Sequence, residues 1–386
     1  MGILDNGKTL SLDFGSDIIK GVVGKHSKKG IVVEKCFRIE LPVGLYEDGE
    51  IKDLDQMTYL LRNGLSENNA NQLATHAVIN STSVVMREVT LPKVSKEEIE
   101  AIITYQLEDY IPINPDDYIV KYLQLGSIVE EGVDKLLILL VGVPRTMIQS
   151  HLTLLRNVNL KPEVLDYHGN AIAKLISAGG LINDTYDNNR TIACIDLGAK
   201  FTDLTIIEDG KVRVARVIEK GFDAMVQSIK LRVPGINEED ILKLIDSIDD
   251  ISRKPTMDEA NAEFIEALRD NIYEVLDRVE MIFRYYKTRE VSNEINFILL
   301  YGGLSAIKGI DKMCIDFFDL DAGILKSLNK IRFNDRLGLY ANAIGGLIRL
   351  SEVKKWEILT FLNPFWIKSS LNLIRWFSCI YCWQLQ

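Results

Sequence analysis

Apolar runs of strand length and amphipathic helical segments follow one another along most of this chain. Residues 9–42 contain three apolar runs separated by short polar turns, a pattern that predicts three strands. Residues 191–219 repeat this arrangement, and a helical pattern follows each set, at 53–65 and at 222–231. The order strand, strand, strand, helix therefore occurs twice. It predicts two α/β lobes, each built on a mixed sheet.

Residues 80–160 interrupt the first lobe with a pattern of their own. Ser95 and Glu98 form a capping-box sequence, which predicts the start of a helix. We expect an inserted α+β subdomain whose aromatic side chains, such as Tyr105, belong to its core, with the lining of a partner groove as the alternative. Its predicted elements are a strand at 84–91, a helix at 96–109, strands at 118–125 and 135–143, and a helix at 145–158.

The second lobe carries an insertion at about 234–290 that has a helical pattern. Its longest segment, 261–289, places apolar residues along one side, as expected of an amphipathic helix. Glu274 and Arg278 lie four residues apart on its surface. That spacing favours a solvated ion pair, worth roughly a few tenths of a kcal/mol.

Two predicted hairpins carry the same Asp-x-Gly sequence where their first strand ends. The first has Asp13 and Gly15, and the second has Asp196 and Gly198. Glycine lets a backbone amide approach a phosphate oxygen, and the adjacent aspartate can hold Mg²⁺ through water. One copy is a common turn. Two copies about half a chain apart predict hairpins that grip a single nucleotide from both sides.

A third motif follows a predicted strand at 296–300. Gly302 and Gly303 come directly after it, and two glycines allow a ligand to lie against the backbone. Ser305 is placed to cap the next helix. Each of the three motifs is weak alone, and their order and spacing make them informative together.

In this order the motifs resemble those of the ATPase superfamily that includes actin, DnaK-type chaperones and sugar kinases. The sequences at Asp13 and Asp196 resemble its two phosphate loops, and Gly302-Gly303 resembles its adenosine loop. The resemblance implies a duplicated actin-like (ribonuclease H-like) two-lobe ATPase fold with an α+β subdomain inserted in the first lobe. Small residues at 170–173 and 341–346 resemble the connecting helices, where the lobes would pack and hinge.

The same resemblance implies ATP and Mg²⁺ as cofactors. Asp13 and Asp196 would position Mg²⁺, through water, together with the attacking water. The long helix would lie beside the adenosine, so Glu274 or Arg278 would touch ribose or adenine as the alternative to an ion pair. No residue is assigned as a general base. The other implied cofactor-binding residues are Gly15, Ser16, Lys20, Gly198, Ala199, Thr202, Gly302, Gly303 and Ser305.

A narrower resemblance covers nearly all of residues 8–350. The stretches 91–99 and 105–112 are similar to the PilM family of type IV pilus assembly proteins, whose relatives include FtsA and the cytoplasmic domains of type II secretion proteins. It implies a first lobe at 8–190 and a second at 191–350. Lys200 in the second phosphate loop departs from the pattern.

The resemblance to this family implies that the chain is an ATP-binding scaffold that hydrolyses ATP slowly at most. It also implies a place in the cytoplasm, at the inner face of the membrane. The implied partner is the N-terminal peptide of a PilN-like inner-membrane protein, bound in a nucleotide-linked way, and the resemblance leaves room for self-association. Two alternatives remain, a membrane-tethering filament protein like FtsA and a small-molecule kinase. The insertion at 80–160 replaces the segment expected to supply a kinase's base, which favours the scaffold.

The composition limits the kinds of partner that the chain is expected to bind. The net charge of −10 and the pI of about 5.1 argue against nucleic acid. Residues 1–8 lack the apolar stretch of a secretory signal. Cys36 and Cys194 fall in strand patterns and are expected to be buried thiols in a reducing compartment. Cys379-x-x-Cys382 has redox or metal spacing, but no second pair and no nearby histidine.

All four tryptophans lie in the last segment, 351–386. Lys368 and Arg375 interrupt its apolar run, so it is a poor membrane span, and its helical apolar face suits the membrane interface. Binding to lipid is thus one interpretation. The others are that residues 359–365 mimic the short peptide with which PilN docks, that the tail packs on the second lobe, or that it has no selected function.

Overall fold

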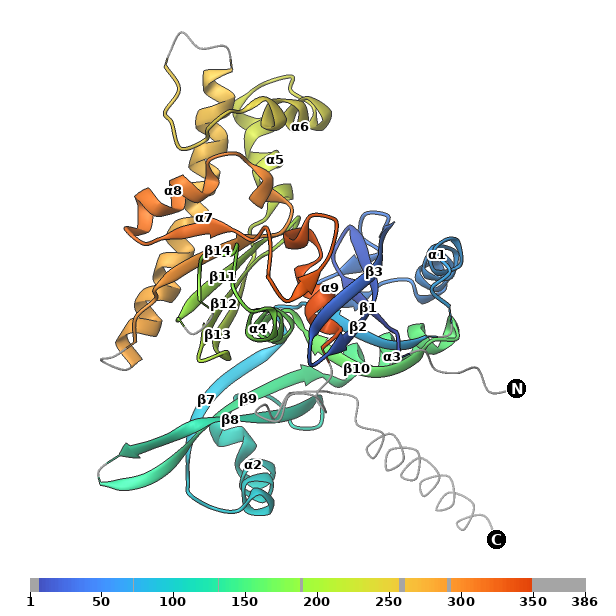
Figure 1. Cartoon of the computed structure of the whole chain (residues 1–386), viewed down its shortest axis with the longest axis vertical. Helices are drawn as coiled ribbons and strands as arrows, with labels where there is room; N and C mark the ends of the chain where they lie inside the picture. The colour runs from blue at the N-terminus through green and yellow to red at the C-terminus, as the bar shows by residue number, and fades with distance from the viewer. Residues whose placement is uncertain are drawn as a thin grey trace.

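Two large sheets, one in each half of the chain, form the body of this computed structural model (Figure 1). The structure describes residues 7–348 except 72, 131, 188–189, 257–260 and 290–292. The six-stranded sheet has the order β10 (Lys161–Tyr167), β6 (Ala74–Ile79), β1 (Thr9–Phe14), β2 (Ile18–Ser27), β3 (Gly30–Glu40) and β16 (Ile331–Arg332). The five-stranded sheet has the order β13 (Lys211–Ile218), β12 (Thr202–Glu208), β11 (Ile192–Leu197), β14 (Phe297–Tyr301) and β15 (Ala322–Ile324).

Both sheets are mixed and share one plan, as the repeated pattern predicts. An antiparallel hairpin, β1–β2 or β11–β12, is flanked by a parallel strand, β6 or β14. The tips are built alike, because Gly15 N–H donates to Ile18 O at 3.2 Å and Gly198 N–H donates to Phe201 O at 3.1 Å. The duplication therefore extends to the hydrogen bonds of the two turns.

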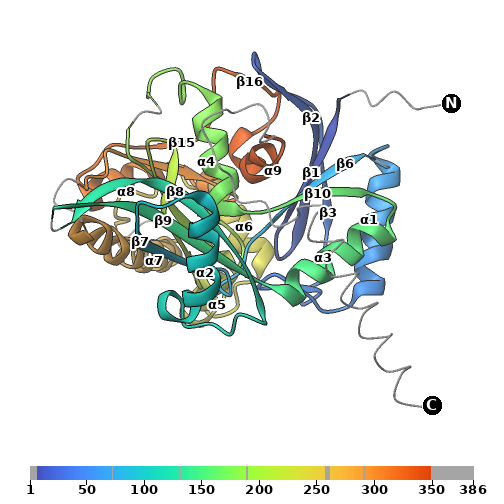
Figure 2. The same ribbon diagram turned by 90° about the horizontal axis from the view of Figure 1, so that it is seen from below.

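Two helices lie between the sheets, α4 (His168–Gly179) and α9 (Ala341–Gly346) (Figures 1 and 2). They contain the small-residue segments predicted to connect the lobes. A Cβ added to Gly345 would lie 2.0 Å from the carbonyl oxygen of Ala171, so only glycine permits this approach. The side chains of α4 and α9 belong to one apolar core that also contains residues of both large sheets.

The chain between β6 and β10 of the six-stranded sheet forms a separate small sheet, of order β7 (Val85–Pro92), β9 (Val133–Pro144), β8 (Tyr118–Glu130). Helix α2 (Lys96–Tyr110) covers it and starts with the predicted capping box of Ser95 and Glu98. Tyr105 on α2 is 88% exposed, so the expectation that it belongs to the core is wrong. Helix α3 (Arg145–Asn157) packs on β10 and on α1 (Leu54–Glu67) of the first lobe.

Helices of the second lobe pack on the outer side of its sheet (Figure 1). The apolar side of the long helix faces this core, as its periodicity predicts. The helices of this lobe are α5 (Phe222–Arg232), α6 (Glu238–Ser247), α7 (Ala262–Arg289), α8 (Ile310–Phe318) and the 3₁₀ helices η1 (Leu304–Ala306) and η2 (Leu337–Leu339). In the first lobe, β4 (Tyr46–Glu47) and β5 (Glu50–Ile51) form a small hairpin.

None of the helices in the described part of the chain is long and apolar enough to cross a membrane. The tail at 351–386, with its tryptophans and its Cys379-x-x-Cys382 pair, lies outside the described residues. The proposed boundaries of the lobes and insertions stay predictions.

Candidate functional site

The first Asp-x-Gly hairpin supplies a buried ion pair to the space between the lobes. Asp13 ends β1 and is 1% exposed, and Lys20 lies opposite it in the register of β2. Lys20 Nζ lies 3.4 Å from Asp13 Oδ2. Burial alone would raise the pKa of Asp13, but the charges and hydrogen bonds of Lys20 and His168 lower it to about 2. Asp13 is therefore ionised at neutral pH.

The second hairpin supplies Asp196 at the end of β11. Asn342 Nδ2 of α9 donates to Asp196 Oδ2 at 2.8 Å, and Tyr301 donates its hydroxyl to Asn342 Oδ1 at 3.3 Å. Burial raises the pKa of Asp196 to about 6, helped by the neighbouring carboxylates and opposed by Lys20 and His168. Gly302 packs on this carboxylate with φ +86°, and a Cβ there would lie 2.1 Å from Asp196 Oδ1. The third motif thus contacts the second.

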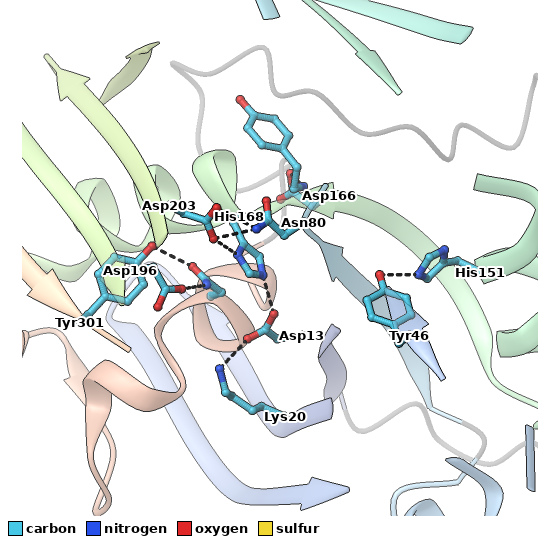
Figure 3. A network of polar contacts seen from close by, with 12 residues as sticks. Asp13, Lys20, Tyr46, Asn80, His151, Asp166, His168, Asp196, Asp203 and Tyr301 are labelled. Carbon is cyan, nitrogen blue, oxygen red and sulfur yellow. Dashed lines mark hydrogen bonds and ion pairs between the residues drawn. The ribbon is translucent and has the colours of Figure 1, made fainter. Parts of the chain in front are cut away.

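His168, the first residue of α4, joins the two lobes (Figure 3). It donates Nε2–H to Asp13 Oδ1 at 2.7 Å and Nδ1–H to Asp203 Oδ2 at 3.0 Å. Burial would lower its pKa, but the two carboxylates raise it to about 10, so the ring is a cation at neutral pH. Asn80 Nδ2 reaches both oxygens of Asp203 at 2.8 Å from the end of β6.

The charges at this site favour binding of a further cation. Three buried carboxylates, those of Asp13, Asp196 and Asp203, face two cations, Lys20 and His168. Carboxylate oxygens of Asp196 and Asp203 lie within 4.8 Å of each other and of a ring nitrogen of His168, which as an imidazolium would not itself ligate a metal. Carboxylate oxygens are the donors that Mg²⁺ prefers, and the three carboxylates outnumber the two cations beside them. The residues therefore fit a magnesium ion.

The two hairpin tips are only partly buried, at Gly15 and Ser16 in the first lobe and at Gly198 and Ala199 in the second. The carbonyls of Gly198 and Ala199 accept the first backbone amides of α5. Lys200, the departure from the family pattern, reaches across the lobes to Glu47 at 3.3 Å.

The structure does not bring every predicted residue to the site. Glu274 forms an ion pair with Lys220, so the predicted pair with Arg278 is wrong. Thr202 donates its hydroxyl to the Lys220 carbonyl at 2.7 Å and is fully buried. Ser305 lies inside η1 and donates its hydroxyl to the Gly302 carbonyl at 2.7 Å. The expectation that Ser305 caps a helix is therefore wrong. Gly303 is exposed beside it.

Four polar residues of the site were missed from the sequence, namely Asn80, His168, Asp203 and Asn342. Asp203 had a signal, because it lies seven residues after Asp196 as Lys20 lies seven after Asp13, and each faces its aspartate in the hairpin register. His168 and Asn342 lie in the first turns of the two helices between the sheets, and Asn80 follows β6. Their meeting depends on tertiary structure that no local pattern reports.

Comparisons with known proteins agree with this geometry. A family model described as type IV pilus assembly protein PilM matches residues 11–340. The structure of a PilM–PilN type IV pilus biogenesis complex is 16% identical, has a TM-score of 0.70 and covers 88% of this chain and 97% of that one. The ethanolamine utilization protein EutJ from Carboxydothermus hydrogenoformans is 12% identical, with a TM-score of 0.52 over 88% of this chain and 89% of that one. The fold is therefore that of the actin-like ATPases.

Proposed function

Because the chain belongs to the PilM family of type IV pilus assembly proteins, we propose that it is a scaffold that binds Mg-ATP between its lobes. One observation carries the nucleotide site: two hairpins of equal geometry place Asp13 and Asp196 in one buried cluster beside Lys20. An acidic cluster that also holds an ammonium group suits a metal ion together with phosphate oxygens.

Each part of the cluster has a task in this proposal. Asp13 and Asp196 hold Mg²⁺ through water, and the metal would neutralise phosphate charge when bound. Lys20 and the amides around Gly15, Ser16, Gly198 and Ala199 bind the phosphates, while Gly302 and Gly303 line the adenosine. Thr202 and Ser305 act by holding backbone in place. Glu274 and Arg278 stay candidates for ribose contact.

His168 argues against rapid turnover. As a cation held by two carboxylates it has no free site for a proton from water, so it does not serve as a base in this arrangement. Slow hydrolysis, or binding alone, therefore suits the site better than metabolic catalysis.

Isothermal titration calorimetry with Mg-ATP tests the site. Asp13→Asn and Asp196→Asn keep the side-chain shape and remove the anchoring charges, so each is expected to weaken binding at least about tenfold. Asp246→Asn, on the exposed side of α6, is the matched control and should bind as the wild type does. Unchanged affinity in both site variants, with the fold intact by circular dichroism, would refute the shared site.

The proposed partner is the N-terminal peptide of a PilN-like inner-membrane protein, bound on the first lobe, which would hold the chain at the cytoplasmic face of the membrane. The similarity to a PilM–PilN complex supports this partner. Nucleotide is proposed to change the angle between the lobes at α4 and α9, and thereby the peptide affinity. Fluorescence anisotropy of a labelled peptide is expected to give different dissociation constants for the apo, ADP and ATP forms. Equal constants would make the protein a static adaptor.

A further inference from the structure

An arginine-lined cavity lies where the inserted subdomain meets the second lobe. The edge strand β7 of the small sheet runs beside the edge strand β13 of the five-stranded sheet. Between them and the end of α7 is a cavity of about 170 Å³, lined by four arginines among other residues. They are Arg87 of β7, Arg213 and Arg216 of β13, and Arg289 of α7.

Two of these arginines already bind a carboxylate. Glu88 of β7 is 5% exposed, and its Oε1 lies 2.6 Å from Arg289 Nη2 while its Oε2 lies 3.5 Å from Arg213 Nε. Arg213 also pairs with Glu208. Guanidinium groups from different elements thus converge on one anion at the wall of the cavity, a geometry typical of oxyanion recognition.

The other two arginines also line the cavity, but both are exposed residues. Arg87 comes from the subdomain and Arg216 from the second lobe, and in the part of the chain that the structure describes neither has a carboxylate partner. Partial burial lowers the pKa of Arg216, and the positive charges of Arg289 and Arg87 add to that effect. The cavity thus gathers positive charge in a chain whose net charge is −10.

We propose that Arg87 and Arg216, with Arg289 and Arg213 behind them, form a binding site for a phosphate-type oxyanion that cross-links the inserted subdomain to the second lobe. Phosphate carries up to two negative charges near neutral pH, which matches the excess of two guanidiniums over carboxylates. The site is separate from the nucleotide cluster, because it contains none of Asp13, Lys20, Asp196 or His168.

The test is calorimetric titration of the full-length protein with inorganic phosphate at constant ionic strength. Arg87→Gln and Arg216→Gln are each expected to weaken phosphate binding at least about tenfold. Arg284→Gln, an exposed arginine of α7 that pairs with Glu280, is the matched control. Lys20→Gln removes a cation of the nucleotide cluster and should retain this phosphate site, which separates the two sites.

Further variants make the result decisive. Arg216→Lys keeps the charge but loses the planar fork, so it is expected to bind several-fold more weakly while folding normally. Sedimentation with phosphatidic acid vesicles that requires Arg216 would identify a lipid headgroup as the source of the phosphate, whereas binding of free phosphate alone would identify a small ligand. Equal phosphate affinity in wild type and both glutamine variants overturns the proposal, as does Arg216-dependent binding of a polyglutamate peptide without binding of phosphate.

Discussion

His168 is the residue on which the charge balance between the lobes depends. Its imidazolium contacts a carboxylate from each lobe, Asp13 and Asp203, and all three side chains are buried. Its pKa is higher in the folded chain than in the unfolded one, so its contribution to stability is complete at low pH. That contribution is lost as the pH rises from about 6.5 towards about 10. A metal ion arriving at Asp13 must compete with this cation.

Replacing His168 with glutamine is expected to strengthen the response to magnesium. Without the imidazolium, three carboxylates face Lys20 alone, so His168→Gln should lose roughly 3 kcal/mol of unfolding free energy in the absence of metal. Mg²⁺ should restore part of this loss, giving a larger rise in melting temperature than in wild type. Thermal unfolding with and without Mg²⁺ checks the expectation, with His26→Gln as a control outside the cluster. An equal Mg²⁺ effect in all three proteins would contradict it.

The contribution of His151 to stability has the opposite dependence on pH and is lost in acid. It is fully buried, donates Nδ1–H to the Met147 carbonyl at 2.8 Å and accepts the Tyr46 hydroxyl at Nε2 at 3.0 Å (Figure 3). Burial lowers its pKa from 6.5 to about 4, so the unfolded state binds the extra proton between these values. Stability is therefore lost as the pH falls through this window, by about 3 kcal/mol from this residue.

Urea unfolding of wild type and His151→Gln at neutral pH and near pH 4 measures this loss. The glutamine cannot titrate, so the stability difference between the two proteins should shrink by about 3 kcal/mol on acidification. Other acid-sensitive groups are common to both proteins and cancel in the comparison. A difference independent of pH would show that His151 does not bear this cost.

Elements that are amphipathic or strongly apolar could be predicted from the sequence. The sequence predicts both sets of three strands, the helix α2 with its capping box, and the long helix α7. Local periodicity and the signals at their ends are enough to specify these elements. Three site motifs were found because glycine and aspartate mark the turns that carry them. Asn80, His168 and Asn342 were missed because they act at the ends of separate elements, and only packing of α4 and α9 between the sheets brings them together.

The contact between α4 and α9 makes a prediction at this scale. Gly345→Ala places a methyl group against the Ala171 carbonyl, so the two helices must separate, and we expect a loss of about 1–3 kcal/mol in unfolding free energy. Gly126→Ala on β8 is the control, because a Cβ there meets no atom within 4 Å. Urea denaturation of both variants measures the effect. If Gly345→Ala is as stable as the control, the helices are not held as closely as described.

The molecule as a whole consists of two lobes joined by α4 and α9, followed by a tail that carries every tryptophan. Since the described residues contain no tryptophan, indole fluorescence reports on the tail alone. Contacts between the lobes include the His168 cluster and the Lys200–Glu47 ion pair. A change in lobe angle would alter both, which makes them natural reporters of nucleotide binding.

Removing the tail is expected to separate membrane contact from nucleotide binding. A chain ending at residue 350 should keep its Mg-ATP affinity and melting temperature and lose sedimentation with anionic liposomes. The reason is that cations near an anionic leaflet add roughly 1 kcal/mol each to binding, and interfacial tryptophans add burial. A blue shift of indole emission on adding liposomes to the full chain is the second measurement. Unfolding of the shortened chain would instead make the tail a packing element.

The matched positions of Lys20 and Asp203 make the site between the lobes electrostatically asymmetric. In the two equivalent hairpins, one half of the chain faces its aspartate with an ammonium group and the other half faces its own with a carboxylate. Two identical halves would present the same groups to both ends of an enclosed molecule, which could then enter in either orientation. Divergence at this one pair of positions removes that degeneracy, because the negative end of a ligand is attracted to one half and repelled by the other. In this duplicated fold, a single exchange of charge, between Lys20 and Asp203, thus distinguishes the two ends of a bound ligand.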